Sequence, residues 1–145
     1  MIVKKKEFEK LRHELINLYD KESELEHVKN VEKIAIQICK LWEVEDDFKQ
    51  WICIGCIAHD IGKTKEVENW YEKNRFPKIN HRIRGALYFS NKFDTKNYVK
   101  YMIWYHNGKV GKKSQKNLSK KAKTAIAIVH TADQIANMRI EKLME

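Results

Sequence analysis

Histidine and aspartate side chains recur in this sequence at positions where a helical protein needs apolar residues. Four of the six histidines and two aspartates lie either in apolar helical stripes or at the ends of predicted helices: His27, His59, Asp60, His81, His106 and Asp133. A carboxylate or imidazole on a buried helix face is costly unless it is paired or hydrogen-bonded. Imidazole and carboxylate together suit Mn, Fe, Co, Ni or Zn, and suit Ca or Mg much less. The set therefore predicts a site for a divalent transition metal.

Two of these residues interrupt apolar stripes with helical spacing. His27 is in phase with a stripe that continues through Val31, Ile34, Ile38 and Leu41. Asp133 lies inside another stripe, formed by Ile126, Val129, Ala136 and Ile140. A single inward-facing histidine usually has a structural role in a core, whereas an unpaired carboxylate in mid-helix requires a cation.

The other four residues lie at the ends of predicted helices. His59 and Asp60 close the very apolar run 51–58 and precede the tripeptide Ile61-Gly62-Lys63. His81 begins one predicted helix, and His106 ends another. Side chains at the ends of several helices can converge on one point, as a metal site needs.

The elements that must position these residues are all predicted to be helices. Apolar spacing predicts six of them, over residues 4–18, 23–42, 46–59, 81–93, 97–105 and 119–143. Ser23, followed by Glu26, is predicted to cap the second helix as a capping box. The stretch 63–80, which contains the single proline, is predicted to be irregular, and residues 107–118 are predicted to form a loop.

Length and composition agree with one all-α domain. The 145 residues suit a single domain, and one Pro and five Gly are too few for the turns of a β-sandwich or barrel. With 43% hydrophobic residues the chain can bury a core, which excludes a disordered tail. The longest apolar run is far shorter than the roughly 20 residues of a membrane span. No secretory signal is visible, so we expect a cytoplasmic protein without a membrane partner.

The three cysteines and the two remaining histidines are not expected to be metal ligands. Cys39, Cys53 and Cys56 fit free thiols in a reducing compartment. The Cys-x-x-Cys pair could bind zinc, but no second pair is present, so we interpret these residues as small apolar side chains of a buried helix. His13 is predicted to be exposed, and His130, one turn before the last aspartate of the set, is predicted to support a ligand.

Charge is distributed unevenly along the chain. The formal net charge of +9 divides into −3 for residues 1–71 and +12 for residues 72–145, and the segment 109–123 holds seven lysines and no acid. Such a segment is either a solvated surface or an anion-binding one. Its position after two of the candidate ligands favours the second interpretation.

The motifs resemble the HD superfamily of metal-dependent phosphohydrolases. The resemblance rests on His27, on the string Ala58-His-Asp-Ile-Gly-Lys63 and on Asp133 within Thr131-Ala-Asp-Gln-Ile135, and it covers residues 23–140. It implies a helical HD-domain bundle over residues 1–145, with an HD core in 23–140 after an N-terminal helix in 1–22.

The resemblance also implies roles for the six candidate ligands. His27, His59, Asp60 and Asp133 would bind a first metal ion. His81 and His106 stand where binuclear members carry two further histidines, so they would bind a second ion, with Asp60 as the bridge. A water molecule activated by the metal would then attack phosphorus.

Two branches of the superfamily come closest. Small bacterial hydrolases of dinucleoside polyphosphates share the order of His, His-Asp, His, His and Asp. The HD nuclease domains associated with CRISPR interference share the string around His59, the stretch from His81 to Ala86 and the basic second half. Many of the nucleases carry a His-His pair where this chain has His106 and Asn107.

These observations lead to one main hypothesis and two alternatives. We expect a phosphohydrolase of a small phosphorylated substrate, most simply a nucleotide, with Asp60 and Lys63 as catalytic residues. Contacts to substrate phosphate are expected from four basic side chains: Lys63, Arg82, Arg84 and Lys109. The alternatives are a metal-dependent nuclease acting on single strands and a helical nucleic-acid-binding module without catalysis. The sequence leaves the oligomeric state open.

Overall fold

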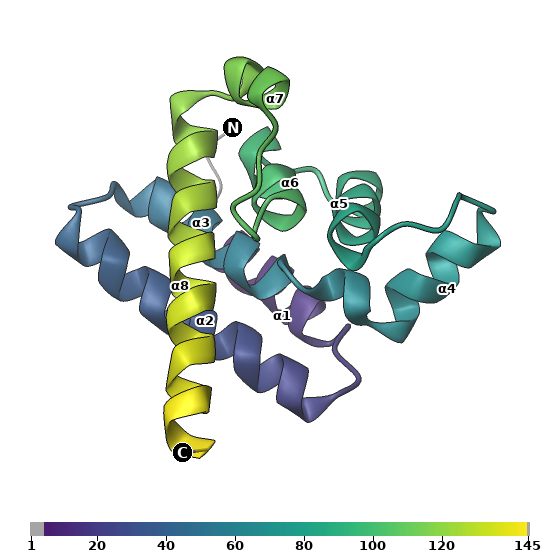
Figure 1. The fold of residues 1–145 in the computed structure, drawn as a ribbon, viewed down its shortest axis with the longest axis horizontal. Helices are drawn as coiled ribbons and strands as arrows, with labels where there is room; N and C mark the ends of the chain where they lie inside the picture. Colours follow the sequence, from purple (N-terminus) through teal and green to yellow (C-terminus); the bar gives the residue numbers. More distant parts are fainter. Residues whose placement is uncertain (1–4, 145) are drawn as a thin grey trace.

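The computed structural model describes the backbone of residues 5–144 and the side chains of residues 5–138, and all its regular elements are helical (Figure 1). The prediction of an all-α fold is thus confirmed. The elements are α1 (Lys5–Ile16), α2 (Glu22–Leu41), α3 (Asp46–Ala58), the 3₁₀ turn η1 (Ile61–Lys63), α4 (Lys65–Lys73), α5 (His81–Lys92), α6 (Asn97–Trp104), α7 (Lys112–Asn117) and α8 (Lys120–Met144).

Helix α3 forms the centre of the core. Its apolar side chains point in every direction, so a stable fold must cover the helix on all sides. Helices α1, α2, α6 and α8 pack against it. Ile52, Ile54 and Ile57 are at most 2% exposed, and the two main clusters of buried apolar residues share this helix. The turn that follows α3 therefore starts from a rigid, buried support.

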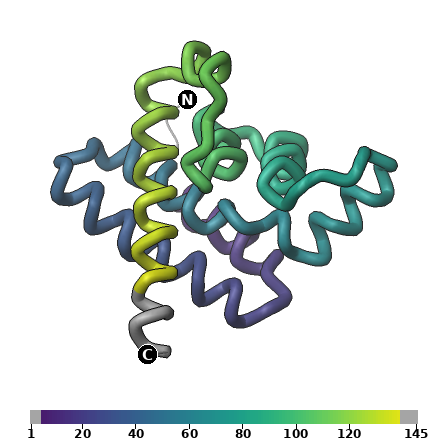
Figure 2. The backbone as a smooth tube through the Cα atoms, viewed as in Figure 1, coloured from purple at the N-terminus to yellow at the C-terminus, as the bar shows by residue number. Residues whose placement is uncertain are grey.

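Helices α2 and α8, far apart in the sequence, pack against each other across one side of the molecule (Figures 1 and 2). Val31 and Ala35 of α2 belong to the same buried cluster as Val129 and Ala132 of α8. This packing brings the stripe that contains His27 against the stripe that contains Asp133. On the opposite side, α5 packs against η1 and α6.

The prediction of an irregular stretch over residues 63–80 was wrong for its first half, which contains the end of η1 and all of α4. Thr64 caps α4, because its hydroxyl accepts a hydrogen bond from the backbone N–H of Val67 at 3.4 Å. Val67 and Tyr71 then bury one face of this short helix. Three apolar residues in nine were too few for the helical pattern to be recognised.

Two smaller predictions also need correction. The stretch 107–118, predicted as a loop, contains α7, which buries none of its residues and so has no apolar stripe to reveal it. Ser23 does not cap α2, because the helix begins one residue earlier, at Glu22, and Lys21 is the cap without a side-chain hydrogen bond. The other helices begin and end within two residues of the predicted limits; position 4 lies outside the described residues.

The cysteines behave as predicted from composition. All three are free thiols, with Cys39 and Cys56 buried and Cys53 partly buried. Burial raises the pKa of Cys53 to about 12 and that of Cys56 well above its usual value, so both thiols stay protonated and are poor metal ligands. Among the described helices, none is long and apolar enough to cross a membrane.

Candidate metal centre

The turn after α3 presents the central pair of polar side chains. His59 follows the last residue of α3, Asp60 precedes η1, and both are buried, at 0% and 3% exposure. Thr64 fixes the far end of the turn, because its hydroxyl donates to the carbonyl of Ile61 at 2.7 Å while accepting from α4. Two buried polar side chains are thus held by rigid elements on both sides.

A close backbone approach places α5 against this turn. A Cβ atom on Gly62 would lie 1.8 Å from the carbonyl oxygen of His81, so only glycine fits here without displacement. Arg84 strengthens the approach, since its Nε and Nη2 both donate to the Gly62 carbonyl, at 2.9 and 2.7 Å. His81, the first residue of α5, is thereby brought beside Asp60.

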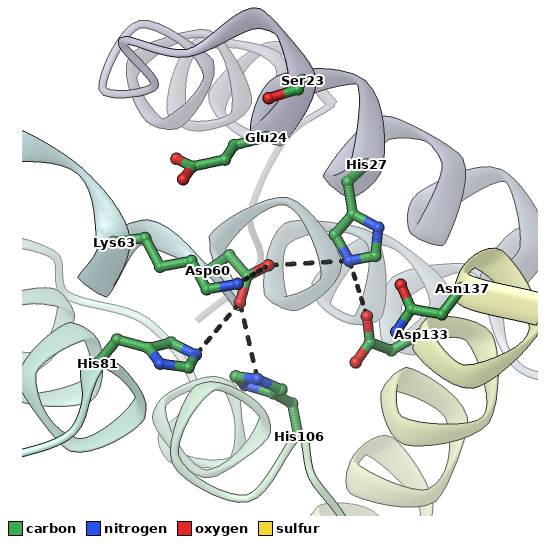
Figure 3. Close-up of a pocket in the computed structure, with 9 residues that line it drawn as sticks. All are labelled: Ser23, Glu24, His27, Asp60, Lys63, His81, His106, Asp133 and Asn137. Carbon is green, nitrogen blue, oxygen red and sulfur yellow. Dashed lines mark hydrogen bonds and ion pairs between the residues drawn. The ribbon is translucent and has the colours of Figure 1, made fainter. Parts of the chain in front are cut away.

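Asp60 stands between two groups of histidines (Figure 3). Its Oδ2 lies 3.4 Å from Nε2 of His59 and 3.7 Å from Nε2 of His27. Its Oδ1 lies 3.5 Å from Nε2 of His81 and 3.6 Å from Nε2 of His106. The two oxygens of one carboxylate therefore face two different sets of imidazoles.

Asp133 completes the first of these groups. Its Oδ1 lies 2.7 Å from Nε2 of His27 and 3.4 Å from Nε2 of His59. The donor atoms of His27, His59 and Asp133 all lie within 4.8 Å of one another, as do those of His59, Asp60 and His106. The structure thus brings together all six residues that the sequence singles out. Five of them form groups that could hold a metal ion, and the sixth, His81, lies beside Asp60.

Hydrogen bonds fix the tautomers of two of the histidines. Nδ1 of His59 donates to the carbonyl of Cys56 at 2.6 Å, and Nδ1 of His106 donates to that of Ile103 at 2.9 Å. Because a carbonyl can only accept, a proton sits on Nδ1 of each ring, and Nε2 is the atom that faces Asp60 and is available to a metal ion.

Two buried nitrogen atoms make the case for a metal ion. Nε2 of His59 and Nε2 of His81 are buried without a hydrogen-bond partner among the described residues. Their nearest carboxylate oxygens stand at 3.4 and 3.5 Å, the outer limit of a hydrogen bond. A buried polar atom left unsatisfied is costly. Coordination to a cation between the imidazoles and the carboxylates would satisfy both atoms, so the donor set fits a transition metal ion.

The electrostatics keep two aspartates ionised and one histidine neutral. Burial lowers the pKa of His59, but Asp60 and Asp133 outweigh it and raise that pKa, so a metal ion that binds His59 would displace a proton. Burial opposes ionisation of Asp60, but His59, His81 and Lys63 outweigh it and keep the pKa of this carboxyl well below its usual range. Burial also raises the pKa of Asp133, but the hydrogen bonds and charges of His27 and His59 outweigh burial and lower this pKa below its usual range. Burial and repulsion from His59 lower the pKa of His106 to about 4, so its imidazole is neutral at pH 7.

Five of the six candidate ligands line a pocket of about 340 Å³, a size suited to a small ligand, and the sixth, His59, is fully buried. Its lining includes Lys63, whose Nζ lies 3.5 Å from Oδ2 of Asp60. Ser23, Glu24 and Asn137 also line it and were not predicted as site residues. Glu24 lies one turn before His27 and Asn137 one turn after Asp133, so helical spacing from the predicted ligands could have found both.

Three basic residues predicted to contact substrate phosphate do not line this pocket. The guanidinium of Arg84 is bound to the Gly62 carbonyl and lies near Glu68. Arg82 donates to the carbonyl of Trp104 at 2.7 Å. Lys109 is exposed on the segment before α7. Geometry supports a structural role for the two arginines.

Two residues support the site from behind. The hydroxyl of Tyr19, a buried residue, donates to the carbonyl of Ile57 in the last turn of α3. Nδ1 of His130 donates to the carbonyl of His106 at 3.0 Å, in line with its predicted supporting role. His13 is exposed, as predicted.

Comparison with known proteins gives a match to a family model. Neither the curated proteins nor the solved structures contain a chain that matches this one. A family model described as "HD domain" matches residues 25–138, a segment that includes all six candidate ligands. HD domains generally bind divalent metals through His and Asp residues and are metal-dependent hydrolases. The match spans most of the sequence, and the chain therefore belongs to the HD domain family.

Proposed function

We propose that this protein is a metal-dependent phosphohydrolase that cleaves a phosphoester or phosphoanhydride bond of a small nucleotide-type substrate. The observation that carries the proposal is a pair of buried Nε2 atoms, on His59 and His81, that have no hydrogen-bond partner within the described part of the chain. They face opposite oxygens of the ionised Asp60. Family membership supports the hydrolytic class of reaction.

The ligand groups support a site for two divalent ions. His27, His59 and Asp133 would hold the first ion together with Oδ2 of Asp60. His81 and His106 would hold the second together with Oδ1 of Asp60. A carboxylate whose oxygens face two separate imidazole groups is suited to bridge a metal pair. Mn, Fe, Co, Ni and Zn all accept this donor set.

Bound divalent ions supply a water of lowered pKa and neutralise charge on phosphate oxygens. The chain's own residues orient the reactants. Lys63, whose side chain is 42% exposed, can leave its contact with Asp60 and bind a phosphate oxygen. The buried α3 holds His59 and Asp60 in place, which limits the movement of the ligands during the reaction.

Metal analysis and a substrate panel test this proposal. The purified protein should contain tightly bound transition metal and should release phosphate from nucleotides when supplied with Mn, Fe, Co or Ni. Asp60→Ala should abolish turnover while leaving the helical circular dichroism spectrum unchanged. Full activity in this variant would refute the catalytic proposal.

One observation favours a second candidate function, a nuclease acting on single-stranded nucleic acid. All seven lysines of the segment 109–123 are exposed, around α7 and the start of α8, where they could attract a polyanion. Affinity for single-stranded DNA should then fall steeply with salt, and a flat response would exclude this candidate. Both candidates agree with the predicted cytoplasmic location.

A further inference from the structure

We propose that Glu24 is a specificity-determining residue that selects phosphomonoesters whose organic part carries a hydrogen-bond donor, such as a nucleoside monophosphate, over polyphosphates. This inference rests on the proposed function and concerns which substrate the pocket accepts.

Glu24 lines the pocket and carries one carboxylate oxygen that is not used by the fold. Figure 3 shows its carboxylate projecting from α2 into the space above Asp60 and Lys63. Its Oε2 is buried and has no hydrogen-bond partner among the described residues. A buried carboxylate oxygen without a donor is costly. Glu24 lines the pocket, and the terminal torsion of a glutamate is soft, so rotation of the carboxylate would turn this oxygen toward a donor on a bound ligand.

The helix itself does not account for this side chain. Glu22 and Glu24 both lie in the first turn of α2, where negative charge is favourable. Glu22, which is exposed, gains the same attraction to the N-terminus of the helix without burying a carboxylate oxygen. The helix therefore does not require the burial of Glu24. A hydroxyl or amino group on a bound substrate would pair with Glu24, so the geometry points to a ligand contact.

The charges around the pocket favour one phosphate group. Asp60, Asp133 and Glu24 contribute three carboxylates, and Lys63 is the one cationic lysine or arginine among the described lining residues. Two divalent ions held by neutral imidazoles would bring the total to about +2, which one phosphate dianion balances. Each additional phosphate would add negative charge near Glu24 without a matching cation.

The test compares three substrates at fixed Mn²⁺ concentration: AMP, ATP and phenyl phosphate. ATP has the same organic part as AMP with more charge, and phenyl phosphate keeps the monoester without a donor. Glu24→Gln should raise the ratio of kcat/KM for ATP to that for AMP about tenfold, the effect of removing one charge at roughly 10 Å in a partly solvated site. It should lower the ratio of kcat/KM for AMP to that for phenyl phosphate severalfold, because a neutral amide oxygen accepts a hydrogen bond from the substrate more weakly than a carboxylate does.

Glu22→Gln is the matched control, since it removes the same charge from the same helical turn outside the pocket. It should leave both ratios unchanged. Adenosine binding followed by NMR provides a readout without metal ions, and Glu24→Gln should weaken it severalfold. The inference is overturned if Glu24→Gln changes kcat/KM for all three substrates by one common factor, or if it leaves the affinity for adenosine unchanged. It is also overturned if Glu22→Gln changes the kcat/KM ratios as much as Glu24→Gln does. If the unmodified protein turns over none of the three with any metal, the proposed function itself fails, and this inference fails with it.

Discussion

Gly62→Ala tests how the close approach of η1 and α5 shapes the site. The new Cβ would lie 1.8 Å from the carbonyl oxygen of His81 and 3.0 Å from the backbone nitrogen of Gly85. Ordinary contact begins near 3.4 Å, so the turn and α5 must separate by about 1.6 Å. Both neighbours are backbone atoms, and no change of rotamer can relieve the overlap. We expect a net loss of about 1–3 kcal/mol in the free energy of unfolding.

The same displacement should damage one half of the metal centre. It would move Nε2 of His81 from 3.5 Å to roughly 5 Å from Asp60 and would break the hydrogen bonds of Arg84 to the Gly62 carbonyl. His27, His59 and Asp133 are positioned by α2, α3 and α8, so their group should survive. Metal analysis after dialysis should show one equivalent lost and one retained.

Calorimetry should show a melting temperature lowered by several degrees, given about 3 °C per kcal/mol for a chain of this size. Gly111→Ala is the matched control, because a Cβ there has no neighbour within 4 Å. It should change neither the melting temperature nor the metal content. A Gly62→Ala variant with normal stability and two bound metal equivalents would refute the reasoning.

Three further predictions concern stability and binding. In the metal-free protein, the pKa of His106 lies near 4, below that of an unfolded histidine near 6.5, so its contribution should be full above pH 6.5 and lost as pH falls toward 4. Denaturant titrations at a series of pH values should show that the unmodified protein loses about 3 kcal/mol more of its free energy of unfolding between pH 6.5 and 4 than His106→Asn does. An equal pH dependence of the two free energies would contradict the lowered pKa of His106. Tyr19→Phe removes the donor to Ile57 and should cost about 1 kcal/mol, and an unchanged denaturation midpoint would argue against that bond. Arg84→Lys keeps the charge but loses the paired contact with Gly62, so it should lower the melting temperature without raising the KM for substrate; the opposite pattern would restore a phosphate-binding role.

The sequence was sufficient to predict the long helices and to single out the residues that converge. Asp133 could be recognised because it interrupts an otherwise apolar stripe in a long helix. Helix α7 could not, because it buries nothing and its segment has no periodic pattern. Helix boundaries held wherever apolar spacing was dense.

Tertiary contacts decide what the remaining polar residues do. Arg84 carries a charge that suits phosphate, and only the three-dimensional approach of α5 to Gly62 shows that its guanidinium is already bound. Ser23 has the right residue type for a cap, but α2 begins before it. From the sequence, Glu24 is interpreted as an acid that stabilises the start of a helix. Only the structure shows that one of its carboxylate oxygens is buried and that the residue lines the pocket.

The distance along the chain between His27 and Asp133 has a consequence for folding. These two residues are 106 positions apart and meet at 2.7 Å. Bringing them together closes a loop that includes most of the chain, and the entropy of that closure must be offset before the first ligand group exists. A divalent ion would therefore bind the native chain and have little affinity for the unfolded one. Metal binding would therefore raise the free energy of unfolding in proportion to the logarithm of the metal concentration, and a chelator would remove this stabilisation.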